Sequence, residues 1–138
     1  RLGSAAKTVR GGYILQDAED SAPELILMGS GSEVHILLAA AEKLFAHEIR
    51  VRVVSMPSLD VFARQPRAYR DEVLPPGIKH RIAMEAASPL SWYRWVGDAG
   101  EVIGLDHFGA SAPYERLYQE FGITAEHVVA RAREMLDR

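Results

Sequence analysis

The sequence predicts an α/β fold, a three-layer α/β/α sandwich around a mainly parallel sheet of about five strands with one antiparallel edge strand. Apolar, β-branched runs recur at Glu24–Met28, Arg50–Met56 and His80–Ala87. The segments between them carry apolar residues at helical spacing, and the connections are short. Because each crossover between parallel strands must return over the sheet, we expect helices on both faces.

The first strand is predicted at Tyr13–Leu15, after a segment without hydrophobic periodicity. Residues 1–10 are small and basic, so we expect a linker from a preceding domain, followed by a single domain over residues 11–138. An acidic, proline-containing loop leads to the second strand at Glu24–Met28. This loop is too short for a parallel crossover, so at least one strand should run antiparallel at an edge.

The strongest helix should follow Met28, where the period of apolar residues changes from 2 to 3.6. Ser30 and Glu33 have the spacing of a capping box, and Ser32 is an alternative cap. The apolar face is formed by Val34, Leu37, Leu38, Ala41, Leu44 and Phe45.

The middle of the chain should continue the alternation. Pro57 ends the strand at Arg50–Met56, and short helical segments are expected at Leu59–Gln65 and Tyr69–Leu74 before the break at Pro75–Gly77. The strand at His80–Ala87 follows.

The last third should contain one strand and three helices. Trp92, Trp95 and Val96 share one helical face, and the glycines of 97–100 end that helix. Thr124 can cap the last helix, which should run to Arg138 with Glu126 in its first turn. The other expected elements are a strand at Val102–Leu105, a turn at Phe108–Pro113 and a helix at Tyr114–Phe121.

Composition excludes several classes of protein. Apolar residues make up 48% of the 138 residues and charged residues 25%, which is typical of a globular domain. No apolar run approaches the roughly 20 residues that span a bilayer, so no membrane partner is expected. The net charge of −3, with both signs interleaved, disfavours nucleic acid. The absence of cysteine excludes disulfides and thiolate chemistry and fits a cytoplasmic protein.

The loop Gly29, Ser30, Gly31 and Ser32 is a candidate anion site, because it lies between a strand and a helix N-terminus. It matches neither a P-loop nor a dinucleotide fingerprint, so a tight turn with capping hydroxyls is favoured. A regulatory module that binds an anion or a nucleotide at this loop remains the alternative.

Other polar residues suggest no catalytic or metal site. The five histidines are scattered, and Asp106 and His107 should point to opposite faces. Ser55, Ser58 and Ser111 lack a nucleophile elbow. Glu85 ends a buried strand, so it should have a partner or an altered pKa.

Several motifs resemble the carboxy-terminal domain of transketolases over the chain from about Arg10 to its end. The most specific are Gly31-Ser-Glu-Val34, Arg52-Val-Val-Ser-Met-Pro-Ser58, Phe108-Gly-Ala-Ser-Ala-Pro113 and Phe121-Gly-Ile-Thr124. The chain opens with Arg1 and its first methionine is Met28, so we expect part of a longer polypeptide.

The resemblance implies a supporting domain of a homodimeric enzyme. The full enzyme would use thiamine diphosphate with Mg²⁺ or Ca²⁺ to transfer a two-carbon ketol unit between sugar phosphates. In the family this domain supplies no known catalytic group, so the resemblance implies no catalytic, cofactor or metal residue in this chain. The family's cofactor motif ends in asparagine, which this chain lacks altogether. Expected contacts with other domains or a second subunit are Trp92, Trp95, Phe108, Ser111 and Pro113.

Overall fold

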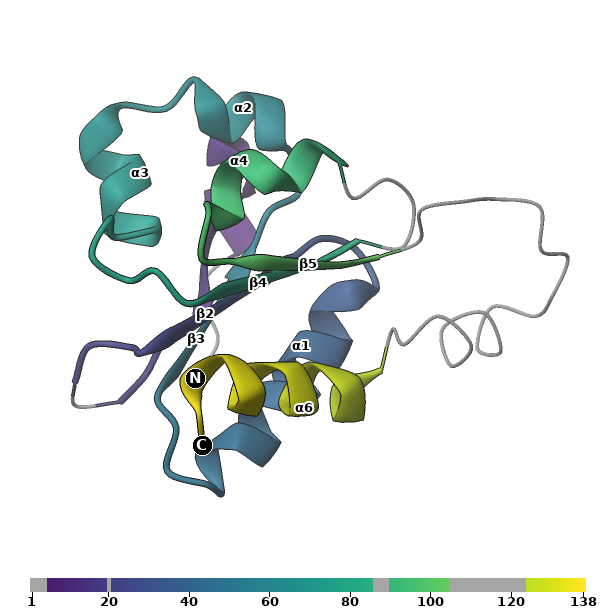
Figure 1. The fold of residues 1–138 in the computed structure, drawn as a ribbon. Helices are drawn as coiled ribbons and strands as arrows, with labels where there is room; N and C mark the ends of the chain where they lie inside the picture. Colours follow the sequence, from purple (N-terminus) through teal and green to yellow (C-terminus); the bar gives the residue numbers. More distant parts are fainter. Residues whose placement is uncertain (1–4, 20, 86–89, 105–123) are drawn as a thin grey trace, which may run out of the picture.

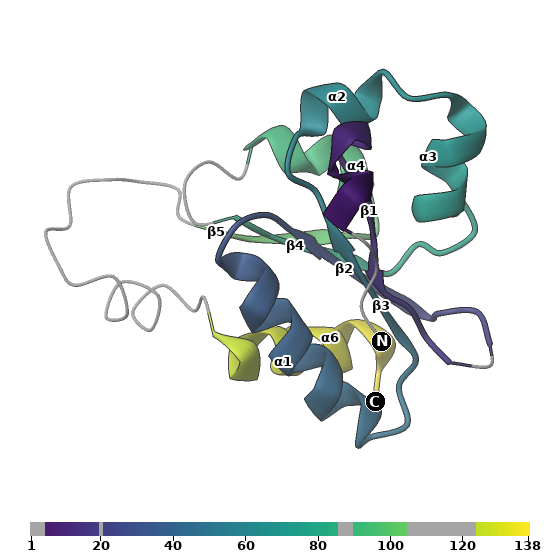
Figure 2. The same cartoon turned by 180° about the vertical axis from the view of Figure 1, so that it is seen from behind.

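The computed structural model describes residues 5–19, 21–85, 90–104 and 124–138. It is an α/β/α sandwich, with α1 and α6 on one face of the sheet and α2, α3 and α4 on the other (Figures 1 and 2). The elements are η1 (Ala5–Arg10), β1 (Tyr13–Gln16), β2 (Leu25–Gly29), α1 (Glu33–Phe45), β3 (Val51–Ser55), α2 (Leu59–Ala63), α3 (Arg67–Val73), β4 (Arg81–Glu85), η2 (Leu90–Trp92), α4 (Tyr93–Val96), β5 (Glu101–Gly104) and α6 (Ala125–Leu136).

The sheet of the described residues has five strands in the order β1-β3-β2-β4-β5. β3, β2, β4 and β5 are parallel, and in this register Leu27 lies beside Val53 and Ile82. β1 runs antiparallel to β3 at one edge. The predicted fold class and antiparallel edge strand are confirmed. β1 pairs with β3 rather than with its sequence neighbour β2.

β2 separates two hydrophobic cores. Its side chains alternate, so Leu25 and Leu27 face α1 and α6 while Ile26 and Met28 face α2 and α4. All four are fully buried, as expected for a central parallel strand with both faces covered.

Half of the predicted apolar face of α1 is fully buried, and Val34 and Leu38 are partly buried. Leu37, Ala41 and Leu44 are buried against the sheet and α6. Phe45 is an error in that prediction: its side chain is 70% exposed, because α1 ends there and the ring lies beyond the sheet-facing stripe.

α6 forms as predicted. Thr124 is its N-cap, and its hydroxyl accepts a hydrogen bond from the His127 N–H at 3.1 Å. Val128 and Ala132 are buried in the core shared with α1. Arg131 donates to both carboxylate oxygens of Glu101 at 2.7 and 2.9 Å, which connects α6 to β5. These hydrogen bonds raise the pKa of the Arg131 guanidinium.

The segment expected as a linker forms a short helix where the structure describes it, since η1 covers residues 5–10. The Arg10 guanidinium lies 4.5 Å from the centre of the Tyr69 ring, and the Tyr69 hydroxyl donates to the Gly12 carbonyl at 2.7 Å. Burial raises the pKa of Tyr69. Gly11 has φ of +81°, and a Cβ there would lie 2.4 Å from the Ser58 carbonyl, so the turn into β1 requires glycine.

Arg52 is a buried cation on the central sheet. Its guanidinium donates to both oxygens of Asp17, at 2.9 and 3.1 Å, and to the carbonyls of Glu72 and Val73. The β1–β2 connection is thereby joined to the end of α3. Within the described residues, no helix is both long enough and apolar enough to cross a lipid bilayer.

Replacing the α6 cap should test its contribution to stability. We expect Thr124→Ala to lower the free energy of unfolding by about 1 kcal/mol, because the His127 N–H loses its acceptor. Thr124→Ser keeps the hydroxyl and should lower the free energy of unfolding much less. Urea denaturation followed by circular dichroism measures both variants. Equal losses would show that the threonine methyl group, and not the cap, carries the effect.

Candidate functional site

The carboxyl ends of β2, β3 and β4 meet at one edge of the sheet, next to a hollow of about 410 Å³. Ser30, Pro57, Ser58, Glu85 and Trp92 are among its lining residues. Here β3 lies on one side of β2 and β4 on the other, which is the position where open α/β sheets commonly bind ligands.

The Gly29–Ser32 loop is a tight turn. The Gly29 carbonyl accepts the Met56 N–H at 2.8 Å, and a Cβ on Gly29 would lie 2.9 Å from Leu37 Cδ1. Gly31 has φ of +60°, a conformation that favours glycine. The loop therefore needs its glycines to connect β2 to α1.

The predicted hydroxyl cap of α1 is wrong in detail. Ser32 occupies the N-cap position, but its hydroxyl makes no capping bond and instead donates to the Glu33 carboxylate at 2.8 Å. The amides of Glu33 and Val34 donate to the carbonyls of Ser30 and Gly31. Glu33 is buried, with its negative charge in the first turn of the helix. These contacts leave the loop poorly suited to an anion, because the first two amides are bonded and a carboxylate is already nearby.

Glu85 has the partner that the sequence analysis expected. The Trp92 indole N–H donates to Glu85 Oε1 at 2.9 Å, and Trp92 is 2% exposed. This hydrogen bond joins the end of β4 to η2 across the 86–89 segment, which lies outside the described residues. The bond places a satisfied carboxylate in the hollow.

Trp92 and Trp95 lie inside the domain. Trp95 is 7% exposed and packs edge-to-face on Phe62 with ring centres 5.1 Å apart. Leu90 and Tyr93 are the exposed large apolar side chains of the same segment. The other expected contacts, Phe108, Ser111 and Pro113, lie outside the described residues, as do Asp106 and His107.

Ser58 has a structural role that sequence analysis missed. It is the N-cap of α2, and its hydroxyl accepts the Val61 N–H at 3.2 Å. A serine after a strand-ending proline, with Asp60 in the first helical turn, is the pattern that could have identified it. Among the described residues, no three His, Asp or Glu side chains gather as a metal site would require.

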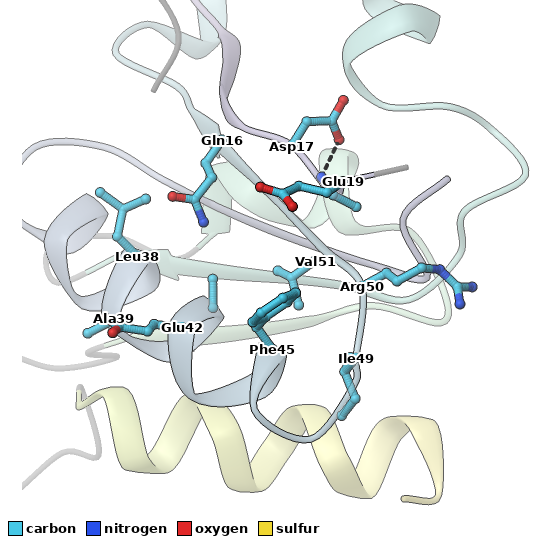
Figure 3. A pocket seen from close by; sticks show the side chains of 12 residues that line it. Gln16, Asp17, Glu19, Leu38, Ala39, Glu42, Phe45, Ile49, Arg50 and Val51 are labelled. Atoms are coloured by element: carbon cyan, nitrogen blue, oxygen red, sulfur yellow. Dashed lines mark hydrogen bonds between the residues drawn. The ribbon is translucent and has the colours of Figure 1, made fainter. Parts of the chain in front are cut away.

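A second hollow, of about 510 Å³, lies between α1 and the β1–β2 connection. Figure 3 shows the Phe45 ring at the end of α1, on the side of the helix that faces Asp17 and Glu19. Leu38 and Ala41 add apolar surface, and Glu42 adds a third carboxylate. We call this hollow the Phe45 groove.

The described geometry defines a class of protein: an α/β domain whose carboxyl-edge hollow is lined by its own turn, helix cap and hydrogen-bonded carboxylate. Comparison with known proteins then gives the family. The family model described as the transketolase-like TK C-terminal domain matches residues 11–124. The chain belongs to this family.

Individual relatives agree with the family model. The chain is 49% identical over 131 residues to Transketolase 1 of Escherichia coli (strain K12), covering 95% of this chain and 20% of that protein. Transketolase from Leishmania mexicana superposes with a TM-score of 0.87 at 40% identity, over 99% of this chain and 19% of its own. Pichia stipitis transketolase in complex with sedoheptulose-7-phosphate superposes with a TM-score of 0.85 at 29% identity, over 99% of this chain and 20% of that chain. The chain thus spans about a fifth of the length of these relatives. None of these matches supports the regulatory module that was the alternative for the Gly29–Ser32 loop.

The hydrogen bond between Trp92 and Glu85 can be measured by a double-mutant cycle. We expect the pair to contribute about 2 kcal/mol to the free energy of unfolding, because the acceptor is a carboxylate. Trp92→Phe, Glu85→Ala and the double variant are compared by urea denaturation, so that the volume lost at each residue cancels. A coupling energy near zero would contradict the assigned role of the bond.

Proposed function

We propose that this chain acts as the carboxy-terminal supporting domain of a transketolase, a cytoplasmic enzyme that transfers a two-carbon ketol unit between sugar phosphates. The observation that carries the proposal is the family match over residues 11–124, within a chain that covers about a fifth of its relatives. The Pichia stipitis relative, described in complex with sedoheptulose-7-phosphate, supports the substrate class.

The catalytic parts of such an enzyme would lie elsewhere in the polypeptide. Thiamine diphosphate and Mg²⁺ or Ca²⁺ would be held by the other domains and by a second subunit of a homodimer. This domain would contribute a stable folded body and contact surfaces. Exposed residues of η2 and α4, together with the 108–113 segment, are expected to be near those contacts.

The Phe45 groove is a further candidate for contact within the enzyme. A phenylalanine that is 70% exposed, beside a hollow that also contains Leu38 and Ala41, is apolar surface that a partner could bury. The relatives carry about four-fifths of their length outside the matched region, so a large body of the same polypeptide would adjoin this domain. We propose that its other domains cover the groove, with basic groups opposite Glu19 and Glu42.

The isolated chain should be inactive. We expect no ketol transfer from a ketose phosphate to an aldose phosphate, and no heat of binding on titration with thiamine diphosphate and Mg²⁺ at micromolar concentrations. Coupled spectrophotometric assays and calorimetry provide the two measurements. Turnover by this chain alone would contradict the proposal that the catalytic groups lie in other domains.

The groove contact is tested by comparing the chain alone with a full-length transketolase that carries it. Phe45→Asp should change the stability of the isolated chain by less than about 0.5 kcal/mol, because the ring is exposed. In the full-length enzyme it should cost about 2 kcal/mol by removing a buried ring from the contact. Ala130→Asp, at an exposed apolar residue of α6 outside the groove, is the control. Identical effects of Phe45→Asp in both proteins would exclude the groove as a contact.

A further inference from the structure

A third hollow, lined by several cations, lies on the face of the sheet that carries α3 and α4. Figure 1 shows these two helices on one side of the sheet. Its volume is about 480 Å³, and it lies where α3, the start of β4 and α4 meet. Its charged lining residues are Arg70, Asp71, Lys79, Arg81, Arg94 and Asp98.

The four cations differ in their partners from several other arginines of the described structure. Arg50, Arg52 and Arg131 each form an ion pair with a carboxylate. Neither Arg70, Lys79, Arg81 nor Arg94 forms an ion pair with any carboxylate that the structure describes. Their charge is therefore not neutralised by a direct partner in the described part of the protein.

Arg81 supplies a half-buried positive charge at the base of this hollow. Its guanidinium donates to the carbonyls of Ile78, Trp95, Leu74 and Pro75 at 2.8 to 3.3 Å. These neutral acceptors hold the group in place without cancelling its charge. Burial lowers the pKa of Arg81, and the nearby charge of Asp71 partly opposes that shift.

Three other cations keep free donors. Lys79 and Arg94 are exposed and make no side-chain hydrogen bond to the described residues. The Arg94 guanidinium lies over the Trp95 ring, 4.5 Å from its centre. Arg70 uses Nε to donate to the Gln65 carbonyl, and no described residue accepts a hydrogen bond from its terminal nitrogens.

Two carboxylates reduce the positive charge without removing it. Asp71 lies 3.7 Å from Arg67, which is outside the hollow, and Asp98 has no ion pair in the described structure. Four cations and two carboxylates leave an excess of two positive charges at a hollow in a chain whose net charge is −3. An excess of two positive charges matches a phosphate dianion.

We propose that this hollow binds a small phosphate dianion, either inorganic phosphate or a phosphate monoester. Lys79, Arg94 and Arg70 would donate to the phosphate oxygens, and Arg81 would add charge from below. The volume is larger than one phosphate group needs, so the organic part of an ester can be accommodated. This inference does not depend on the proposed transketolase function.

The test uses NMR spectroscopy of the ¹⁵N-labelled chain with two probes, inorganic phosphate and glycerol 3-phosphate. We expect saturable shifts of the Lys79 amide and of the amides of α4, with dissociation constants on the order of millimolar. Lys79→Gln combined with Arg94→Gln should weaken binding at least about tenfold, because two charged donors are lost. Tighter binding of glycerol 3-phosphate would identify the ester as the preferred form, and equal binding would identify phosphate itself as the recognised group.

A matched control separates this site from the overall charge of the protein. Lys7→Gln combined with Arg64→Gln removes the same charge from two exposed residues that do not line the hollow. This control should bind within about twofold of the parent chain, since distant exposed charges are screened. All four residues are exposed, so both variants should retain the dispersed spectrum of the parent. Non-saturating shifts, or equal weakening in the two double variants, would overturn the proposal.

Discussion

The complete burial of β2 is the constraint from which the arrangement of the domain follows. A parallel strand at the centre of a sheet must be covered on both faces, so its side chains divide the apolar interior into two cores. α1 and α6 close one core, and α2, α3 and α4 close the other (Figure 2). The same packing explains Gly29, because a Cβ there would lie only 2.9 Å from Leu37 Cδ1 of the covering helix.

The sequence predicted the elements whose pattern is local and periodic. The helix capped by Thr124 and the end of α4 at Gly97 formed as expected, because capping and glycine chemistry act within a few residues. Phe45 was misplaced because spacing alone does not show where the sheet stops beneath a helix. The role of Ser32 was misjudged because the competing Glu33 carboxylate is visible only in three dimensions. The cation cluster could not be predicted from the sequence either. Arg70, Lys79 and Arg94 are far apart in the sequence, and only the folded chain brings them to one hollow.

The carboxyl ends of the strands and the rest of the domain surface differ in how far their polar and apolar groups are satisfied internally. This difference bears on how such a domain can support a larger enzyme. At the carboxyl edge, the turn after β2, the buried Glu33 and the Trp92–Glu85 bond satisfy the polar groups internally. Away from it, Phe45 leaves apolar surface exposed and Arg81 leaves charge uncancelled. These two features lie outside the position where α/β folds most often bind ligands.

The bond between Asp17 and Arg52 shows that an exposed residue can still be sensitive to substitution. The Asp17 side chain is 45% exposed and lies in a loop, where replacement usually has little effect. Asp17 is nevertheless the counter-ion of a guanidinium on the innermost layer of the fold, which also bonds the last carbonyls of α3. A neutral residue at this position would leave an uncompensated charge beneath the surface. The residue that suits this loop position thus depends on a side chain 35 positions away in the sequence.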